Sequence, residues 1–552
     1  MIIQLLIVLP ILHHVVNSLQ ATDFYVHDLP LLPKEASSIR MHAGYLPVNP
    51  QHHGALFFWH FATKNISYKS RTVIWLNGGP GCSSLIGAWA EIGPFRFQDE
   101  NTIIENNGSW NTFANLLFID QPVGTGFSYI DTDSFIHQLN TMANQFLSFL
   151  DRYIEVFPEL IQNDIYLAGE SFAGQYIPYI AQEILTKRMD LKLRGLLIGN
   201  GWIDPITMYE SYLPFAVANN LVQNNSVLYN NIANQVKICQ NALSKKVHVF
   251  ETACESILDQ IMEHGAMNNH NTTKENGRCV NMYDVRLDDT WPHCGMNWPP
   301  DIKYVTLYLH RQDVMLRIHV NSNKSGWTEC ANSVWKTFRA YYSIPSIKLL
   351  PDLLRKIPIV LYSSEYDLIC NHWATEKMID TMTWNNGTGF DLGNGTLALP
   401  EPWIVDDEPA GLIRTARNLT YIFFYNASHM VPYNYARRSR AMLHQFMQLN
   451  SSVNADQITN MNAIENINLP KSRAYKRFGF TATASIIIII ALVGLVWFFV
   501  HKQKQIGIQT PYFRTRVLWS HNRDVELQQL VVYSLLDDGK ENCNASSDIT
   551  FV

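Results

Sequence analysis

The sequence predicts an α/β fold with a mostly parallel central sheet, and three observations support this prediction. An apolar run at 165–168 leads directly into Gly-Glu-Ser-Phe-Ala-Gly at 169–174, which is how a strand delivers a serine onto a sharp turn before a helix. A second apolar run, at 71–74, ends in a glycine-rich loop. The chain has 552 residues, of which 47% are hydrophobic and 12% aromatic, and this is ample material for the core of a large globular domain.

The turn at 169–174 makes Ser171 the candidate nucleophile. A strained turn needs small residues two positions before and after the serine, and Gly169 and Ala173 meet that need. Downstream, the chain supplies a candidate acid in Asp367 and a candidate base in His429. The order Ser, Asp, His is that of the α/β-hydrolases and not of the chymotrypsin or subtilisin types. We therefore expect an α/β-hydrolase fold with this catalytic triad.

The glycine-rich loop Trp75-Leu-Asn-Gly-Gly-Pro-Gly-Cys-Ser-Ser84 predicts a binding site for an oxyanion. Glycines allow backbone N–H groups to face a developing negative charge. We expect the backbone amides of Gly79 and Phe172 to form the oxyanion hole. A serine at a helix start can also be a simple N-cap, but a cap does not require the flanking small residues.

Together these segments make the sequence resemble the serine carboxypeptidases. The resemblance covers about residues 23–450 and its histidine segment, Asn-Ala-Ser-His-Met-Val-Pro, is most similar to the fungal pheromone-processing branch of the family. That branch often carries an acidic stretch before a membrane span, whereas residues 451–477 are short and mildly basic. The five matching segments, in the family's order, are 75–84, 91–94, 118–129, 198–205 and 426–432.

The resemblance implies a site for the free C-terminal carboxylate of a peptide. Glu91 and Glu170 match the paired carboxyls of the family, and Asn77 matches its amide donor. Two carboxyls that share a site with a substrate carboxylate cannot all be ionised, so at least one must hold a proton and donate a hydrogen bond. We therefore expect peptide binding to weaken as the pH rises.

Six cysteines of the predicted catalytic domain are available for disulfide bonds, which are the default in an oxidising compartment. Spacing alone leaves their connectivity open. The resemblance implies Cys82 with Cys330, Cys239 with Cys254 and Cys279 with Cys294. It also implies that Cys370 is a free thiol near the substrate pocket.

The ends of the chain predict a type I membrane protein. The apolar N-terminus is a signal peptide, or alternatively an uncleaved anchor, although its run is short for a span. An uncharged stretch of 23 residues at 478–500 would reach about 35 Å as a helix, enough to cross a bilayer. The predicted organisation is a signal peptide at 1–18, a luminal catalytic domain at 19–450 with a cap insertion at about 202–346, a stalk at 451–477, a transmembrane helix at 478–500 and a cytosolic tail at 501–552.

Short motifs suit a glycoprotein of the secretory pathway. Tyr533 begins a Tyr-x-x-Leu sequence in the tail, which has the form of a clathrin-adaptor sorting signal. Nine Asn-x-Ser/Thr sequons are candidate glycosylation sites, namely Asn65, Asn107, Asn224, Asn271, Asn323, Asn386, Asn394, Asn418 and Asn450.

Composition narrows the function classes. The net charge is −6, and no basic stripe or arginine cluster lies outside the flanks of the predicted span, which argues against nucleic-acid binding. No metal-ligand spacing of the His-Glu-x-x-His or paired Cys-x-x-Cys type is present, so we expect neither metal nor cofactor.

The predicted function is release of C-terminal residues from peptides and propeptides such as pheromone or toxin precursors. The branch resemblance implies a preference for Lys or Arg, action after a kexin-type endoprotease, and a location in the trans-Golgi network or Golgi membrane. The acidic run 406–408 is either a site for the basic residue or a solvated loop. Alternatives are an acyltransferase or esterase on the same scaffold, a vacuolar-type carboxypeptidase of broad specificity, and a silent receptor, against which the complete triad argues.

Overall fold

The computed structural model describes most of the chain before residue 450 and two short segments after it. The chain divides into two units, at 1–450 and 451–552. In the second unit β17 (Arg516–Val517) pairs antiparallel with β18 (Val532–Tyr533). The described residues are 19–33, 38–65, 70–131, 134–265, 276–320, 326–449, 516–517 and 532–533.

A ten-stranded sheet forms the centre of the first unit, in the order β1-β2-β6-β3-β7-β8-β11-β16-β15-β14. The strands from β6 to β16 in this order are parallel, and two antiparallel strands continue the sheet at each edge. The strands are β1 (Met41–Asn49), β2 (Gly54–Phe61), β3 (Arg71–Leu76), β6 (Asn115–Asp120), β7 (Asp164–Ser171), β8 (Lys192–Gly201), β11 (Ile359–Ser364), β14 (Glu401–Val405), β15 (Glu408–Ala416) and β16 (Leu419–Phe424).

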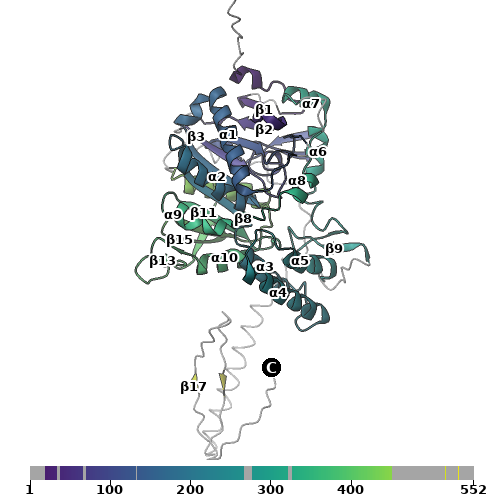
Figure 1. Ribbon diagram of the computed structural model, residues 1–552, viewed down its shortest axis with the longest axis vertical. Helices are drawn as coiled ribbons and strands as arrows, with labels where there is room; N and C mark the ends of the chain where they lie inside the picture. Colours follow the sequence, from purple (N-terminus) through teal and green to yellow (C-terminus); the bar gives the residue numbers. More distant parts are fainter. Residues whose placement is uncertain are drawn as a thin grey trace, which may run out of the picture. The chain divides into compact units, whose positions relative to one another are not determined.

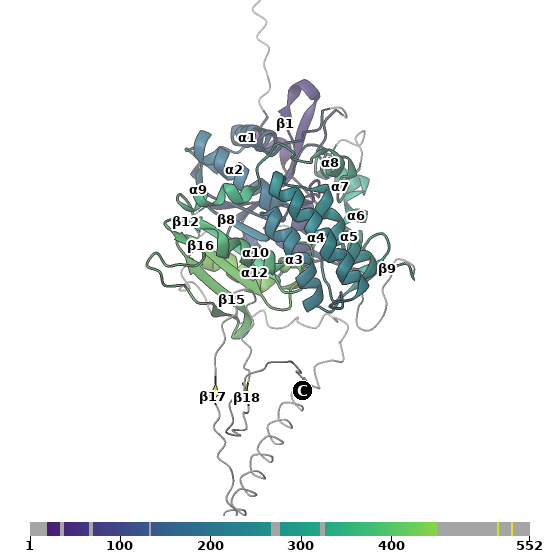
Figure 2. The same cartoon turned by 60° about the horizontal axis from the view of Figure 1, so that its bottom comes forward.

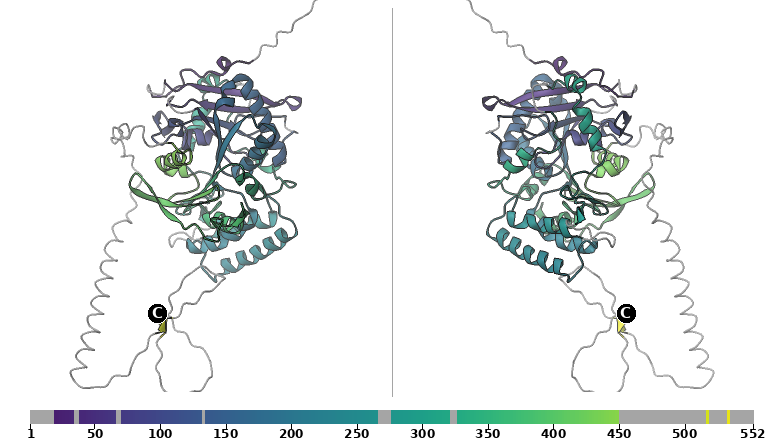
Figure 3. Two further views of the ribbon diagram at one scale, coloured as in Figure 1. Left: turned by 90° about the vertical axis from the view of Figure 1, so that its left-hand side faces the viewer. Right: turned by 90° about the vertical axis from the view of Figure 1, so that its right-hand side faces the viewer.

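The central strands are parallel because both of their faces are covered. β3, β7 and β11 are near-continuous apolar runs that are buried along almost their whole length. Helices α1 (Leu139–Val156) and α2 (Ala173–Lys187) cover one face, and α12 (Ala436–Phe446) covers the other (Figures 1 and 3). The predicted α/β architecture with a mostly parallel sheet is confirmed.

A long segment between β8 and β11 is mostly helical. Its first three helices pack together beside the sheet (Figure 2), and one disulfide joins the second to the third. The segment contains α3 (Pro205–Ala218), α4 (Val227–Lys245), α5 (Thr252–His264), α6 (Ile302–Leu309), α7 (Gln312–Arg317), α8 (Asn332–Thr337), α9 (Leu350–Leu354) and the hairpin of β9 (Arg278–Val280) with β10 (Asp288–Thr290).

The remaining elements are short. A π-helical turn at Gly87–Glu91 follows the glycine-rich loop after β3. The others are the pair β4 (Phe95–Asp99) and β5 (Thr102–Glu105), helix α10 (His372–Thr381), the pair β12 (Thr383–Trp384) and β13 (Gly387–Thr388), and helix α11 (Val431–Asn434).

Several predicted segments lie outside the described residues, namely the signal peptide at 1–18, the stalk at 451–477, the span at 478–500 and most of the tail. Among the helices that the structure describes, none combines the length and the apolar character needed to traverse a bilayer. The transmembrane helix therefore stays a prediction.

Candidate active site

Ser171 stands at the turn between β7 and α2, at the carboxyl edge of the parallel strands. Its backbone adopts φ +61°, a left-handed conformation that is strained for a residue with a side chain. The neighbouring loops come so close that side chains are excluded. A Cβ on Gly169 would lie 2.1 Å from the oxygen of Leu76, and a Cβ on Gly78 would lie 2.3 Å from the nitrogen of Phe172.

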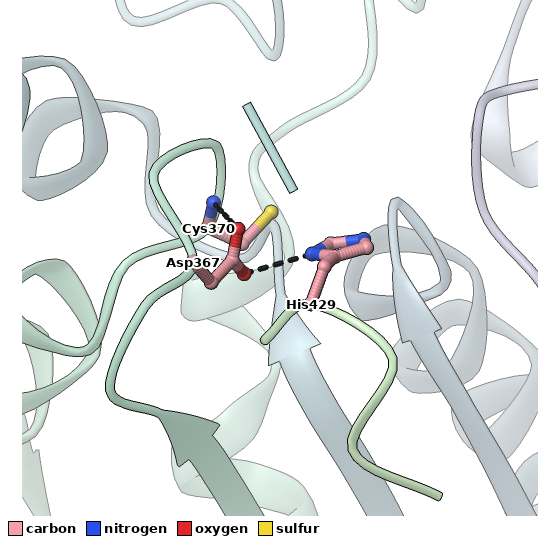
Figure 4. Close-up of side chains that lie close together, drawn as sticks. All are labelled: Asp367, Cys370 and His429. Carbon is pink, nitrogen blue, oxygen red and sulfur yellow. Dashed lines mark hydrogen bonds and ion pairs between the residues drawn. The ribbon is translucent and has the colours of Figure 1, made fainter. Parts of the chain in front are cut away.

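His429 and Asp367 are brought together from the loops after β16 and β11. The Nδ1 atom of His429 is 2.8 Å from Oδ2 of Asp367, and both side chains are buried (Figure 4). Oδ1 of Asp367 accepts a hydrogen bond of 3.3 Å from the backbone of Cys370. Since Nδ1 faces the carboxylate, Nε2 is the ring atom available to Ser171, which lines the same cleft as His429.

The histidine loop is held in place from two sides. The side-chain amide of Asn200, at the end of β8, donates to the carbonyl oxygen of His429, and the amide of His429 donates to the carbonyl oxygen of Tyr283 at 2.9 Å. The ring of Tyr283 also lies over the imidazole, with centroids 4.9 Å apart. The sequence interpretation missed both residues, although Asn200 belongs to a segment that carries the family resemblance.

Two backbone amides face the region beside Ser171. No hydrogen bond from the amide of Gly79 or Phe172 to another group is found within the described part of the chain. Both residues line the cavities around Ser171. Gly79 has φ +104°, which a residue with a side chain rarely adopts. These amides are therefore available donors for an oxyanion.

A buried carboxyl holds the glycine-rich loop. Asp120, at the end of β6, accepts hydrogen bonds from the hydroxyl of Ser83 at 2.5 Å, the amide of Ser84 at 3.0 Å and the amide of Phe127 at 2.9 Å. Burial raises the pKa of Asp120 to about 6, while these hydrogen bonds act in the opposite direction. Asp120 lies in the segment 118–129 that carries the resemblance, but the sequence interpretation gave it no role.

Asn77 joins two buried glutamates beside Ser171. Its Nδ2 atom donates to Oε1 of Glu91 at 3.0 Å and to Oε1 of Glu170 at 3.2 Å. Its Oδ1 atom accepts from the indole of Trp75 at 2.8 Å and from the amide of Gly87 at 3.1 Å. Since those two groups can only donate, they fix the orientation of the amide and point its NH₂ group at the carboxyls.

The carboxyls of Glu91 and Glu170 have a strong preference for the protonated form. Burial raises the pKa of both groups, and the charge of Glu91 raises that of Glu170 further. Both side chains are almost inaccessible to solvent. A proton on one of the two carboxyls removes the repulsion between them and provides a hydrogen-bond donor.

A third glutamate lines the cleft that contains Ser171, Glu170 and His429. Glu329 sits beside the Cys82–Cys330 disulfide, and burial raises the pKa of its side chain to about 7. The sequence interpretation missed this residue. The sequence did contain one signal for it. Glu329 directly precedes Cys330, which the resemblance pairs with Cys82 of the glycine-rich loop.

The disulfides of the structure are Cys82–Cys330, Cys239–Cys254 and Cys279–Cys294, which are the pairings that the resemblance implied. Cys370 is a buried free thiol that lies beside Asp367 and His429 (Figure 4), and it lines a cavity together with Ser171.

The acidic run 406–408 does not reach the site. Asp406 pairs with Arg437 at 3.0 Å and Glu408 with Arg438 at 3.5 Å, and neither acid lines the cavities around Ser171. Of the sequon asparagines, Asn107, Asn224, Asn386, Asn394 and Asn418 are exposed and Asn65 is half-buried, while Asn271, Asn323 and Asn450 lie outside the described residues.

The arrangement as a whole suits acyl transfer at the end of a peptide. A serine on a strained turn, a histidine oriented by a buried acid and two available amides are the parts needed to attack a carbonyl and stabilise its oxyanion. A buried carboxyl pair that holds a proton can receive a carboxylate beside the reacting bond.

Known proteins share this sequence and fold. The profile of the serine carboxypeptidase family matches residues 30–449. The chain belongs to the serine carboxypeptidase family. It is 51% identical over 442 residues to a pheromone-processing carboxypeptidase KEX1 of Tuber melanosporum, covering 78% of this chain and 70% of that protein. It is 45% identical over 518 residues to the KEX1 of Arthroderma otae, covering 88% of this chain and 80% of that one.

A solved structure of a related carboxypeptidase has a similar fold. The crystal structure of Kex1Δp, a prohormone-processing carboxypeptidase from Saccharomyces cerevisiae, matches with a TM-score of 0.72 and 36% identity over 78% of this chain and 96% of that chain. The protein is therefore a serine carboxypeptidase, and its substrates are peptides.

Proposed function

We propose that the protein removes C-terminal lysine and arginine from precursor peptides in the secretory pathway, with Ser171, His429 and Asp367 as its catalytic triad. The observation that carries the proposal is the hydrogen-bonded set of Asn77, Glu91 and Glu170 next to Ser171. A serine hydrolase with such a set beside its nucleophile is adapted to a free C-terminus, which an esterase or acyltransferase does not require.

The chemistry follows from the positions of these groups. Ser171 Oγ attacks the carbonyl carbon of the last peptide bond while His429 takes its proton, and Asp367 stabilises the imidazolium. The oxyanion receives hydrogen bonds from the amides of Gly79 and Phe172. His429 then gives the proton to the nitrogen of the departing amino acid, and a water molecule attacks the acyl-enzyme by the same route to regenerate Ser171.

The preference for a basic residue is supported by Glu329. It lines the same cleft as Glu170 and His429, and burial raises its pKa, with no cation acting on it among the residues that the structure describes. The ring of Trp298 and the side chain of Met296 line the same cleft, and such groups can pack against the aliphatic stem of lysine or arginine. The names of the relatives, pheromone-processing and prohormone-processing carboxypeptidases, point to the same substrates.

Kinetics on short blocked peptides test this specificity. We expect the purified protein to release Arg and Lys from blocked dipeptides at least ~10-fold faster, in kcat/KM, than Leu or Phe. Glu329→Gln should reduce that ratio and leave kcat/KM for Leu within about 2-fold of wild type. Equal rates on all four peptides would contradict the basic preference and favour a broad-specificity enzyme.

The proposed function includes a location and a membrane topology. The N-terminal signal at 1–18 and the uncharged stretch at 478–500 support a single-pass protein anchored in the trans-Golgi network, with its glycosylated catalytic domain in the lumen. There it would act on the C-terminal ends left by a kexin-type endoprotease.

Deglycosylation and carbonate extraction test this topology. Asn544, in the predicted cytosolic tail, should carry no glycan, and a glycan there would reverse the orientation.

Sorting would depend on the tail. Tyr533 begins the Tyr-x-x-Leu sequence that a clathrin adaptor could bind. Tyr533→Ala should move the protein to the vacuole or cell surface without a change in activity, as measured by fractionation. An unchanged distribution would show that another segment determines the location.

A further inference from the structure

The loop between β9 and β10, residues 281–287, lies against both of the loops that carry Asp367 and His429, and we call it the bridging loop. The two loops that it contacts extend from the central sheet. The acid loop, 365–370, follows β11, and the histidine loop, 425–430, follows β16. The bridging loop belongs instead to the helical segment between β8 and β11. The spacing between acid and base is therefore subject to contacts from outside the sheet.

Backbone hydrogen bonds attach the bridging loop to the acid loop on both sides of Asp367. The amide of Val285 donates to the carbonyl oxygen of Tyr366 at 3.0 Å. The carbonyl oxygen of Met282 accepts from the amide of Leu368 at 3.1 Å. The residues before and after the acid are thus held by one and the same loop.

Arg286 contacts both catalytic loops with its side chain. Its guanidinium lies over the ring of Tyr366, 4.3 Å from the ring centroid, and its Nη1 atom donates to the carbonyl oxygen of Asn426 at 3.1 Å. Tyr366 directly precedes Asp367, and Asn426 lies three positions before His429. One guanidinium therefore spans the acid loop and the histidine loop.

Both ends of the contact between Arg286 and Asn426 are fixed in orientation. Nε and Nη2 of Arg286 donate to the two carboxylate oxygens of Asp284 at 2.8 and 2.6 Å, which is the bidentate geometry of a strong ion pair. Asn426 has φ +58°, and its amide donates to the carboxylate of Glu365 at 2.8 Å. The guanidinium thus meets a carbonyl oxygen that already points toward it.

We propose that Arg286 is a positioning residue, which holds the acid loop and the histidine loop at the separation that the hydrogen bond between Asp367 and His429 requires. The inference rests on the proposed function, because the spacing of these loops matters only if Asp367 and His429 act on Ser171. Catalytic groups tolerate little displacement, since a shift of about 1 Å can lower a rate by about 10²-fold. Arg286 itself touches neither the substrate nor the reacting atoms, and it acts through the two loops.

Steady-state kinetics of the full-length protein on a blocked peptide ending in Leu-Arg test the proposal. Arg286→Met removes the guanidinium and keeps a long side chain. We expect kcat to fall by about 10- to 100-fold. We expect KM to stay within about 3-fold, because Asn77, Glu91 and Glu170 are joined by hydrogen bonds of their own. Labelling of Ser171 by a fluorophosphonate should slow by a similar factor, since this reagent needs the triad and not the carboxylate-binding set.

Arg194→Met is the matched control. Arg194 pairs with Asp164 at 2.8 Å, and their side chains are 50% and 8% exposed, close to the 40% and 5% of the pair of Arg286 with Asp284. Asp164 begins β7, so it lies at the edge of the sheet opposite to Ser171. This variant loses a comparable ion pair. It should show a similar decrease of Tm and retain wild-type kcat.

Arg286→Lys gives a graded test. Lysine keeps the charge but lacks the planar fork that contacts Asp284 and Asn426 together, so its kcat should lie between those of wild type and Arg286→Met. Wild-type kcat in Arg286→Met, a loss confined to KM, or an equal loss of kcat in Arg194→Met would overturn the proposal. If Arg286→Met does not fold, wild-type kcat in Arg286→Lys would overturn it. Activity in Ser171→Ala would instead contradict the proposed function.

Discussion

The carboxyl groups of Glu91 and Glu170 share one hydrogen-bond donor, the side-chain amide of Asn77, in the interior of the protein beside Ser171. The first residue belongs to a π-helical turn and the second to the end of β7, 79 positions later. The guanidinium of Arg96 donates to the backbone carbonyl of Glu91 and to that of Pro432, whereas the carboxyl of Glu91 accepts from Asn77. Burial raises the pKa of both carboxyls, which favours a proton on the pair, and a proton is also what a substrate carboxylate needs.

Replacing either glutamate by glutamine should change the pH dependence of peptide binding. A glutamine donates a hydrogen bond without holding a proton, so Glu91→Gln and Glu170→Gln should flatten the rise of KM with pH for peptide substrates. In the wild-type protein KM should rise with pH, because the Glu91–Glu170 pair loses its proton as the pH increases. Steady-state kinetics between pH 4.5 and 8 provide the measurement. An ester substrate without a free carboxylate is the control, and peptide profiles identical to wild type in both variants would place the carboxylate elsewhere.

The fold should be most stable at mildly acidic pH. The pKa values of Glu91, Glu170 and Asp120 are raised in the folded protein, to about 6 for Asp120. A group with a raised pKa contributes stability that is present below its unfolded pKa, near 4, and lost as the pH rises through the folded pKa. Thermal melting should therefore show Tm falling from about pH 5 to pH 8. Glu170→Gln should make that fall shallower, and a Tm that rises over this range would contradict the assignment.

The preference for arginine over leucine at the C-terminus should itself depend on pH. Burial raises the pKa of Glu329 to about 7, so its negative charge is incomplete at acidic pH. The ratio of kcat/KM for the two residues should increase as the pH passes through this value, because only the basic side chain gains from the ionised form. The carboxyl pair affects both substrates alike and cancels in the ratio. In Glu329→Gln the ratio should be flat, and a flat ratio in wild type would exclude Glu329 from this role.

Ser171→Ala should abolish hydrolysis and labelling by a fluorophosphonate while leaving the fold intact. Loss of a nucleophile normally lowers kcat by a factor on the order of 10⁶, and the left-handed backbone at 171 is no harder for alanine than for serine. Ser148→Ala, on the exposed side of α1, is the matched control and should retain full activity. Turnover above about one part in a thousand of wild type in Ser171→Ala would contradict the triad.

Removal of the Cys82–Cys330 disulfide should impair catalysis as well as stability. This bond joins residues 248 apart and anchors the glycine-rich loop, whereas Cys239–Cys254 joins residues 15 apart between α4 and α5. Paired serine substitutions at either site should each lower the free energy of unfolding by about 2–5 kcal/mol. Only the first pair should also lower kcat on a peptide ending in Leu-Arg. Equal kcat values for the two double variants would show that the loop does not need this bond.

The elements that present Ser171 could be predicted because their signals are local. The strand that ends at Ser171 contains the apolar run 165–168, and Gly169 is required where the backbone of β3 approaches it. β3 and the glycine-rich loop after it are likewise marked by an apolar run followed by glycines. Such patterns involve only residues that are neighbours in the sequence, and they predict the parallel sheet.

The residues that surround the nucleophile could not be read in this way. Glu329 reaches the cleft through a tertiary disulfide, 158 positions after Ser171, and no periodic pattern marks it. Asp406 looked like a free acid in the sequence, yet it pairs with Arg437 from α12, which only the packing of the sheet edge brings near. The larger cavity beside Ser171 likewise combines aromatic rings from separate helices of the segment after β8.

The backbone around residue 329 is fixed independently of its side chain. The carbonyl oxygen of Glu329 accepts from the amide of Ser83 at 2.8 Å, and the amide of Ala331 donates to Gly81 at 2.8 Å, on either side of the disulfide. A substitution at this position therefore leaves the loop beside Ser171 in place. We therefore expect a change of side chain at this position to alter which residue is released without loss of hydrolysis, so that specificity can change separately from catalysis.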